Sequence, residues 1–231
     1  VDGDGISTLH FAMALAVDPH GNPIPLNTQD GFFNNVPAIY IRADGSVDPP
    51  TAPILRNGDL YTLTNNIYSG ANGIVIQRNN IILDGAGFTL QGSVGWSDWG
   101  IDLTNRTSVT IKNIGIKGFV AGVNLDNSYN NVISGNNITD NAGAIWLYRS
   151  LGNLISGNTI TSNYNCSILL GFSYLNSILG NSIMNNGAGV GLFSSGNNTI
   201  YHNNFIGNTW QAQTFMSYNF WDDGYPSGGN Y

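Results

Sequence analysis

The sequence predicts an all-β protein folded as a parallel β-helix, with coils of about 22 residues that each carry three short strands. A polar phrase recurs at this spacing, as NVISGNNITDN at 131–141 and NLISGNTITSN at 153–163, with related versions at 176–186 and 197–208. The composition agrees, because the chain has no Glu among its 14 acidic residues and Lys only at positions 112 and 117. Helical proteins use both residue types heavily on their exposed faces.

Residues 1–37 are expected to form an N-terminal extension outside the repeats. Within it, residues 9–17 place a large apolar residue at every second position, which is the period of a strand. A short helix that ends before Pro19 is the alternative. Because both faces of the strand are apolar, we expect it to cap its own β-helix or to engage a neighbouring copy. The residues predicted for self-association are Leu9, Phe11, Met13, Leu15 and Val17.

The β-helix itself is expected to span residues 38–219, and residues 79–92 are predicted to form one of its early coils. Leu83 and Ile111 are then 28 residues apart, where the repeat predicts 22. The extra residues fall within 93–100, which carry Trp96 and Trp99. An insertion between coils becomes a surface loop, and such loops often have a function.

From residue 101 onward, apolar residues align in four columns when the coils are superposed. Within each coil they form i, i+2 pairs such as Ile101 and Leu103, as in a short strand with one buried face. A single coil cannot bury its apolar face, so the coils must stack. The columns are Ile101, Val123, Ile145, Ile168 and Val190; Leu103, Leu125, Leu147, Leu170 and Leu192; Ile111, Ile133, Ile155, Ile178 and Ile200; and Ile116, Ile138, Ile160, Ile183 and Phe205.

Two further columns consist of asparagines at the corners between strands. Asparagine accepts left-handed backbone angles, and its amide can bond to the coils above and below. We therefore assign these side chains to the stack and give them no binding role. The columns are Asn136, Asn158, Asn181 and Asn203, and Asn141, Asn163, Asn186 and Asn208.

Residues 220–231, FWDDGYPSGGNY, form a Gly-rich tail that we expect to be a weak plug for the last coil. No charged cap is evident at either end, and exposed strand edges invite association. A head-to-tail contact that does not close into a ring gives a filament. Asp222 and Asp223 precede Gly224, which favours a turn over a cation site.

Residues 38–68, the early coil at 79–92, the Asn-rich repeats and the tail together resemble archaeal right-handed parallel β-helix proteins of the NosD-like family. That family is named for a periplasmic copper-maturation protein. The resemblance implies right-handed coils and, as one alternative, copper handling. Copper needs clustered imidazole or sulfur ligands. The histidines are His10, His20 and His202 and the methionines Met13, Met184 and Met216, so only His10 and Met13 are neighbours and no metal or cofactor is predicted.

The acidic residues of the repeats give little support for catalysis. β-Helix lyases resemble one another in clustered Asp with a Lys or Arg base, and hydrolases need paired carboxylates. No two acidic residues share a column in successive coils, so no catalytic residue is predicted. The candidate patch, which is more simply interpreted as solvated corner residues, consists of Asp98, Asp102, Asp126 and Arg149.

Carbohydrate binding is more credible than catalysis, because flat aromatic side chains suit sugar rings. The candidate residues are Trp96, Trp99, Trp146 and Tyr148. Aromatic residues also fill protein–protein interfaces, and nothing in the sequence chooses between the two. The net charge of −7 argues against nucleic acid, and no apolar run is long enough to cross a bilayer.

Four Asn-x-Ser/Thr sequons fit a secreted glycoprotein, and a chain that starts at Val1 fits a processed precursor or a trimmed chain. The lone Cys166 lies among apolar residues, so we expect a buried, inert thiol. The sequons are at Asn105, Asn137, Asn165 and Asn197.

These observations favour a non-catalytic extracellular structural protein, a cell-surface or filament subunit whose copies join end to end through the N-terminal strand. One alternative is a β-helix that binds or cleaves polysaccharide at the loop carrying Trp96 and Trp99. A second alternative is copper handling in the manner of NosD.

Overall fold

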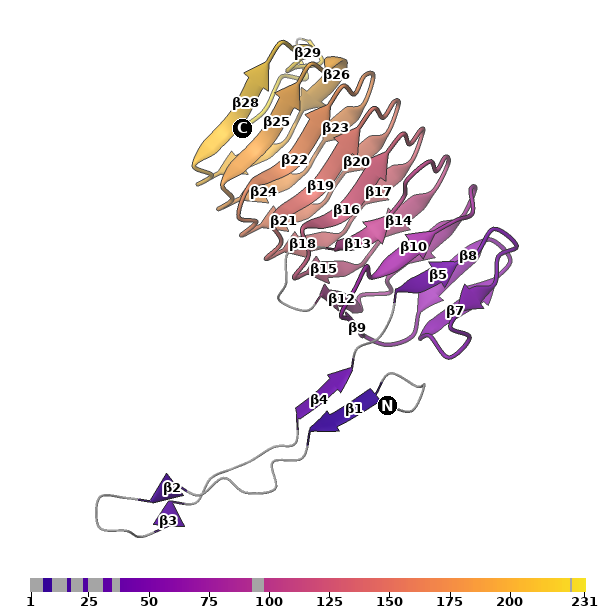
Figure 1. Cartoon of the computed structure of the whole chain (residues 1–231). Helices are drawn as coiled ribbons and strands as arrows, with labels where there is room; N and C mark the ends of the chain where they lie inside the picture. Colours follow the sequence, from indigo (N-terminus) through magenta and orange to yellow (C-terminus); the bar gives the residue numbers. More distant parts are fainter. Residues whose placement is uncertain are drawn as a thin grey trace.

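The computed structural model describes residues 38–92, 98–224 and 226–231, together with the backbone of four short strands nearer the N-terminus. This described part contains strands and turns without a helix, and its three main sheets wrap around one core as a parallel β-helix (Figure 1). The predicted fold class is therefore confirmed. No helix among the described residues is long and apolar enough to cross a membrane.

Each regular coil contributes one strand to each of three sheets, and strands of successive coils pair in parallel. Sheet 1 contains β5 (Ile39–Ile41), β6 (Val47–Asp48), β10 (Ile74–Ile76), β13 (Trp99–Asp102), β16 (Ala121–Asp126), β19 (Gly143–Tyr148), β22 (Cys166–Gly171), β25 (Ala188–Phe193) and β28 (Trp210–Phe215). Sheet 2 contains β7 (Ile54–Asn57), β8 (Leu60–Leu63), β11 (Ile82–Asp84), β14 (Thr110–Lys112), β17 (Val132–Ser134), β20 (Leu154–Ser156), β23 (Ser177–Leu179), β26 (Gly196–Tyr201) and β29 (Tyr218–Phe220). Sheet 3 contains β9 (Ile67–Ser69), β12 (Thr89–Gly92), β15 (Gly115–Lys117), β18 (Asn137–Thr139), β21 (Thr159–Thr161), β24 (Ser182–Met184) and β27 (Asn204–Ile206).

Four described strands precede the β-helix. β1 (Ile6–Leu9) pairs antiparallel with β4 (Gly31–Asn34), and β2 (Ala16–Val17) pairs antiparallel with β3 (Pro23–Ile24). Phe11, Met13 and Leu15 lie outside the described residues, as do His10 and His20. The strand expected over 9–17 therefore stays a prediction.

The four predicted apolar columns form the core. Ile111, Ile133 and Ile155 are direct partners in successive strands, as are Leu125, Leu147 and Leu170. All six of these side chains are fully or almost fully buried. One coil alone would leave them in water, so each coil is stabilised by the next.

Asparagine ladders line the corners, as the sequence predicts. The backbone N–H of Asn136 donates to Oδ1 of Asn158, and that of Asn158 donates to Oδ1 of Asn181. A third asparagine ladder and a serine ladder, which the apolar and corner columns did not predict, repeat at nearly the same spacing. They consist of Asn131, Asn153, Asn176, Asn198 and Asn219, and of Ser128, Ser150, Ser173, Ser195 and Ser217.

Strands that run antiparallel to the stack cover its first described coil. β6 pairs antiparallel with β5, and β7 pairs antiparallel with β8. Charged groups pair beside them: Arg42 with Asp48, and Arg78 Nη2 with the carboxylate of Asp59 at 2.7 Å. Short strands with charged residues discourage edge pairing. The expectation that neither end has a charged cap is therefore wrong for this end.

Candidate functional site

The predicted aromatic face divides into two separate contacts. The rings of Trp99 and Trp146 meet edge to face, with centroids 5.7 Å apart. Trp146 lies over Gly143, where an added Cβ would be 2.0 Å from the indole Nε1. Tyr148 instead packs against Phe172, with centroids 5.6 Å apart. Trp96 lies outside the described residues.

Two members of the candidate acidic patch lie on adjacent strands of sheet 1, where Asp102 pairs with Asn124 and Asp126 pairs with Tyr148. One carboxylate oxygen of Asp102 accepts hydrogen bonds from Thr104 and Asn124, so it holds a corner of the stack. The guanidinium of Arg149 lies 5.0 Å from the ring centroid of Tyr148, and no ion pair joins it to Asp102 or Asp126. Asp98 directly precedes β13, and its backbone carbonyl accepts the N–H of Val120 at 3.0 Å.

A groove of about 410 Å³ lies at the corner between sheets 3 and 1. Phe119 is one of its apolar residues, Gln91, Lys117 and Asp140 supply polar groups, and the exposed Tyr164 also lines it. This groove is not among the sites that the sequence predicts. The sequence did contain a signal for the groove, because Gly92 lines it and the insertion between coils begins directly after Gly92.

The C-terminal coil ends the sheets with β28, β29 and β27, and the described part of the tail bonds to β27 through its backbone. The N–H of Tyr231 donates to Asn203 O at 2.9 Å, and the N–H of Phe205 donates to Tyr231 O at 2.8 Å. Asn230 extends the asparagine ladder by accepting from Asn203. The tail therefore covers the outer edge of sheet 3, whereas the sequence predicts only a weak cap for the last coil.

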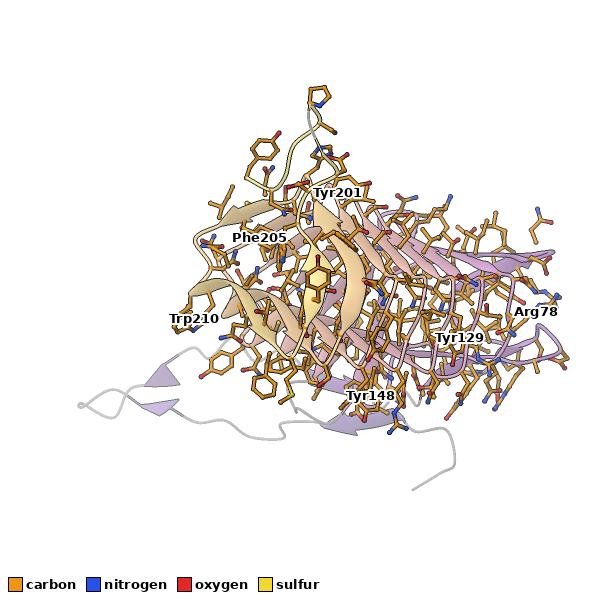
Figure 2. All side chains as sticks on the ribbon, turned by 90° about the horizontal axis from the view of Figure 1, so that it is seen from above. Arg78, Tyr129, Tyr148, Tyr201, Phe205 and Trp210 are labelled. Carbon is orange, nitrogen blue, oxygen red and sulfur yellow. The ribbon has the colours of Figure 1, made fainter. Side chains whose placement is uncertain are left out.

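The outer edge of sheet 1, at β28, has no partner strand among the described residues. All six of its residues are exposed, and no described strand pairs with its outer side (Figure 1). Ala212 and Thr214 take the positions that Val190 and Leu192 occupy one coil earlier, where both are fully buried. Trp210, at the start of β28, lies on the outermost ribbon, far from Arg78 of an early coil (Figure 2). The outer edge of β28 therefore presents backbone N–H and C=O groups with which a further strand can pair. Its inward-facing side chains, Ala212 and Thr214, are small.

Comparison with known proteins identifies the family. Residues 33–231 match the family model described as "Periplasmic copper-binding protein (NosD)". The chain belongs to the NosD family. No curated protein sequence matches it.

Two solved structures resemble this NosD-family chain at low identity. The enzymatically active domain of tailspike protein 2 from bacteriophage CBA120 is 14% identical, with a TM-score of 0.46, over 84% of this chain and 32% of that chain. ORF18 of Geobacillus virus E2 is 12% identical, with a TM-score of 0.27, over 68% of this chain and 48% of that chain. The chain thus spans less than half the length of either structure.

The pair that the sequence places nearest to a copper site, His10 and Met13, lies outside the described residues of this NosD-family chain. No three His, Cys, Asp or Glu side chains among them lie close enough to share a metal ion. His202 Nε2 instead lies 3.1 Å from Ser227 O and 3.7 Å from the Asp223 carboxylate, where it holds the tail. Cys166 is half-buried, where the sequence predicts a buried thiol, and desolvation of its sulfur raises its pKa to about 12, which favours the protonated thiol at neutral pH.

All four sequon asparagines of this NosD-family chain are exposed. Asn105 and Asn197 lie at corners with left-handed φ angles of 60° and 55°, and Asn137 lies in β18. Their exposure leaves each accessible to a modifying enzyme, and their modification stays a prediction.

Proposed function

We propose that this NosD-family chain is a non-catalytic structural subunit whose copies join end to end. The observation that supports the proposal most directly is the open edge of β28, with every residue exposed on an otherwise tightly packed stack. Unpaired strand edges of this kind bind a further strand through backbone hydrogen bonds.

We infer that the N-terminal segment of a neighbouring copy, in the strand predicted for residues 9–17, adds to this edge. Residues 9–17 place large apolar side chains at alternate positions, and β28 presents the small Ala212 and Thr214 on its inward side. Large side chains added beside these two would continue the apolar columns of sheet 1. The opposite end of the stack carries antiparallel strands and ion pairs, so a donated segment joins copies better than direct stacking of coils.

Repetition of this contact does not close on itself and produces a filament. We place the filament outside the cytoplasm, at the cell surface. Two observations support that location: the family is described as periplasmic, and four sequons are exposed.

Substitution of Thr214 by proline tests the proposal without breaking a bond inside the subunit. Leu103, in the same column, donates its N–H to Asn124 O of the following coil at 2.9 Å, so the N–H of Thr214 points to the open side. Proline removes that donor and is tolerated on edge strands. Thr214→Val is the matched control, because it keeps the N–H and the branched shape.

Negative-stain microscopy and light scattering of the full chain provide the measurement. We expect filaments for the wild type and for Thr214→Val, and separate particles for Thr214→Pro. A wild type that stays monomeric, or a Thr214→Pro variant that assembles like the valine variant, contradicts the proposal.

The groove at the corner between sheets 3 and 1 supports binding of a short oligosaccharide as a second candidate function. Its volume of about 410 Å³ falls within the range of ligand sites, and Tyr164 offers an exposed ring beside Lys117 and Asp140. A glycan array with the wild type and Tyr164→Ala tests it. A signal that Tyr164→Ala abolishes supports the candidate function, and no signal for the wild type removes it.

A further inference from the structure

Exposed apolar side chains gather along one corner of the β-helix, between the end of each sheet 1 strand and the start of the next sheet 2 strand. These side chains lie directly above one another in successive coils, since Tyr129, Leu151 and Tyr174 form successive parallel bridges. Tyr148 lies at the rim of the molecule in Figure 2. We call these residues the corner stripe: Tyr129, Tyr148, Leu151, Phe172, Tyr174, Leu175, Phe193, Phe215, Met216 and Tyr218.

Backbone strain within the corner stripe points to a function outside the subunit. Phe172, Leu175 and Met216 have left-handed φ angles of 51°, 56° and 49°, which disfavour large side chains. Asparagine, serine or glycine takes most of the equivalent positions in neighbouring coils, at Asn127 and Asn130 among others, while Arg149 takes the one before Phe172. The three large side chains are 50%, 59% and 77% exposed, so burial within the chain does not offset the strain.

The size of the corner stripe matches a stable protein interface. Its ten side chains expose on the order of 1,000 Å² of largely apolar surface. Monomeric proteins rarely expose more than a few hundred Å² in one patch, whereas each partner of a standard interface buries about 800 Å².

The charge of the corner stripe favours a second copy of this chain as the partner. The stripe segments 171–175, 193–197 and 215–218 contain no charged residue, and a cationic side chain, Arg149, lies beside Tyr148 with its guanidinium 5.0 Å from the ring centroid. Two copies, each with a net charge of −7, repel unless they meet on such an uncharged surface. The even spacing of the coils, about 4.8 Å, also lets the ridges of one stripe fit between those of another.

We infer that the corner stripe is a lateral contact between two copies of this chain, with Phe172, Tyr174 and Leu175 near its centre. The contact is isologous, so the same residues face one another across a two-fold axis. It is distinct from the end-to-end joining proposed above and would turn single filaments into paired ones.

The test uses the full chain carrying Thr214→Pro, so that end-to-end joining does not contribute. In this background, Phe172→Asn with Leu175→Asn removes two central side chains and places asparagine where left-handed angles suit it. Sedimentation equilibrium measures the dimer, and thermal unfolding measures the subunit. We expect the parent to dimerise and the double variant to dimerise at least tenfold more weakly, without a lower unfolding temperature.

The control is Leu55→Asn, which removes an apolar side chain that is 63% exposed but lies on β7, away from the corner stripe. We expect it to dimerise like the parent. A monomeric parent, an unchanged double variant or an equal loss in the Leu55→Asn variant overturns the inference. A double variant that unfolds at a lower temperature overturns the strain argument on which it rests.

Asn197 provides an independent check, because it lies in the same corner column as Leu175. A glycan there would separate the two stripes. We therefore expect chains glycosylated at Asn197 to be excluded from the dimer fraction, and their enrichment in that fraction contradicts the inference.

Discussion

The side-chain oxygen of Asn158 accepts two hydrogen bonds from Asn136, one from its backbone N–H at 2.9 Å and one from Nδ2 at 3.0 Å. Both residues are buried, so neither donor of Asn136 can turn to water. Because unsatisfied buried groups are costly, Asn158→Ala is expected to lower the free energy of unfolding by about 2–4 kcal/mol. Chemical denaturation measures this change.

The matched control for the ladder is Asn137→Ala, one position after a ladder asparagine but exposed on β18. We expect a loss below about 0.5 kcal/mol. Equal losses at positions 137 and 158 would mean that the ladder adds nothing beyond ordinary strand propensity.

Gly143 is expected to determine where Trp146 lies. An added Cβ would meet the indole Nε1 at 2.0 Å and the Cys166 carbonyl oxygen at 2.9 Å, so Gly143→Ala must displace the ring. We expect a loss of about 1–3 kcal/mol and a weaker near-ultraviolet dichroism signal from the Trp99–Trp146 pair. An unchanged spectrum contradicts the placement of the pair.

The carboxylate of Asp84 is expected to make stability depend on acid pH. Burial alone would raise its pKa, but hydrogen bonds from the Ala86 N–H and Asn113, together with Lys112 at 3.1 Å, hold the pKa below its usual value. A carboxyl with a lowered folded pKa stabilises the protein above about pH 4, and this contribution is lost as the pH falls further. Asp84→Asn should therefore destabilise the fold at pH 7 and much less at pH 3, as urea unfolding at both values would show. An equal loss at both pH values contradicts the expectation.

The thiol of Cys166 is expected to react slowly in the native protein. Its pKa of about 12 leaves almost no thiolate at neutral pH. Alkylation followed by mass spectrometry should proceed far more slowly than for free cysteine and should accelerate in denaturant. Native Cys166 that reacts like free cysteine would show that the sulfur is accessible.

The sequence predicts the fold well because the stack repeats its physical requirements in every coil. Ile133 and Ile155 recur 22 residues apart because they are direct neighbours in adjacent strands. The ladder of Asn131 follows the same rule and could have been found by the same alignment. Periodicity alone was therefore enough for the core and the corners.

Features that do not repeat from coil to coil could not be predicted from periodicity. The strands β6 and β7, which cover the first described coil, occur once and run antiparallel to the stack. They belong to no repeated column of residues, so periodicity could not predict them. The two aromatic contacts depend on the direction in which Trp146 leans, which the space over Gly143 determines. The open edge of β28 depends on the absence of a further described strand, although its sequence resembles earlier coils.

Hydrogen exchange at β28 tests end-to-end joining most directly. Site-resolved measurements would follow the amides of Ala212 and Thr214 as the concentration of the full chain rises, with Ile168 and Leu170 of the internal β22 as reference. We predict that the β28 amides become protected upon assembly while the reference amides stay unchanged. Fast exchange at Ala212 and Thr214 in assembled material would show that the edge stays unpaired, and would contradict the account.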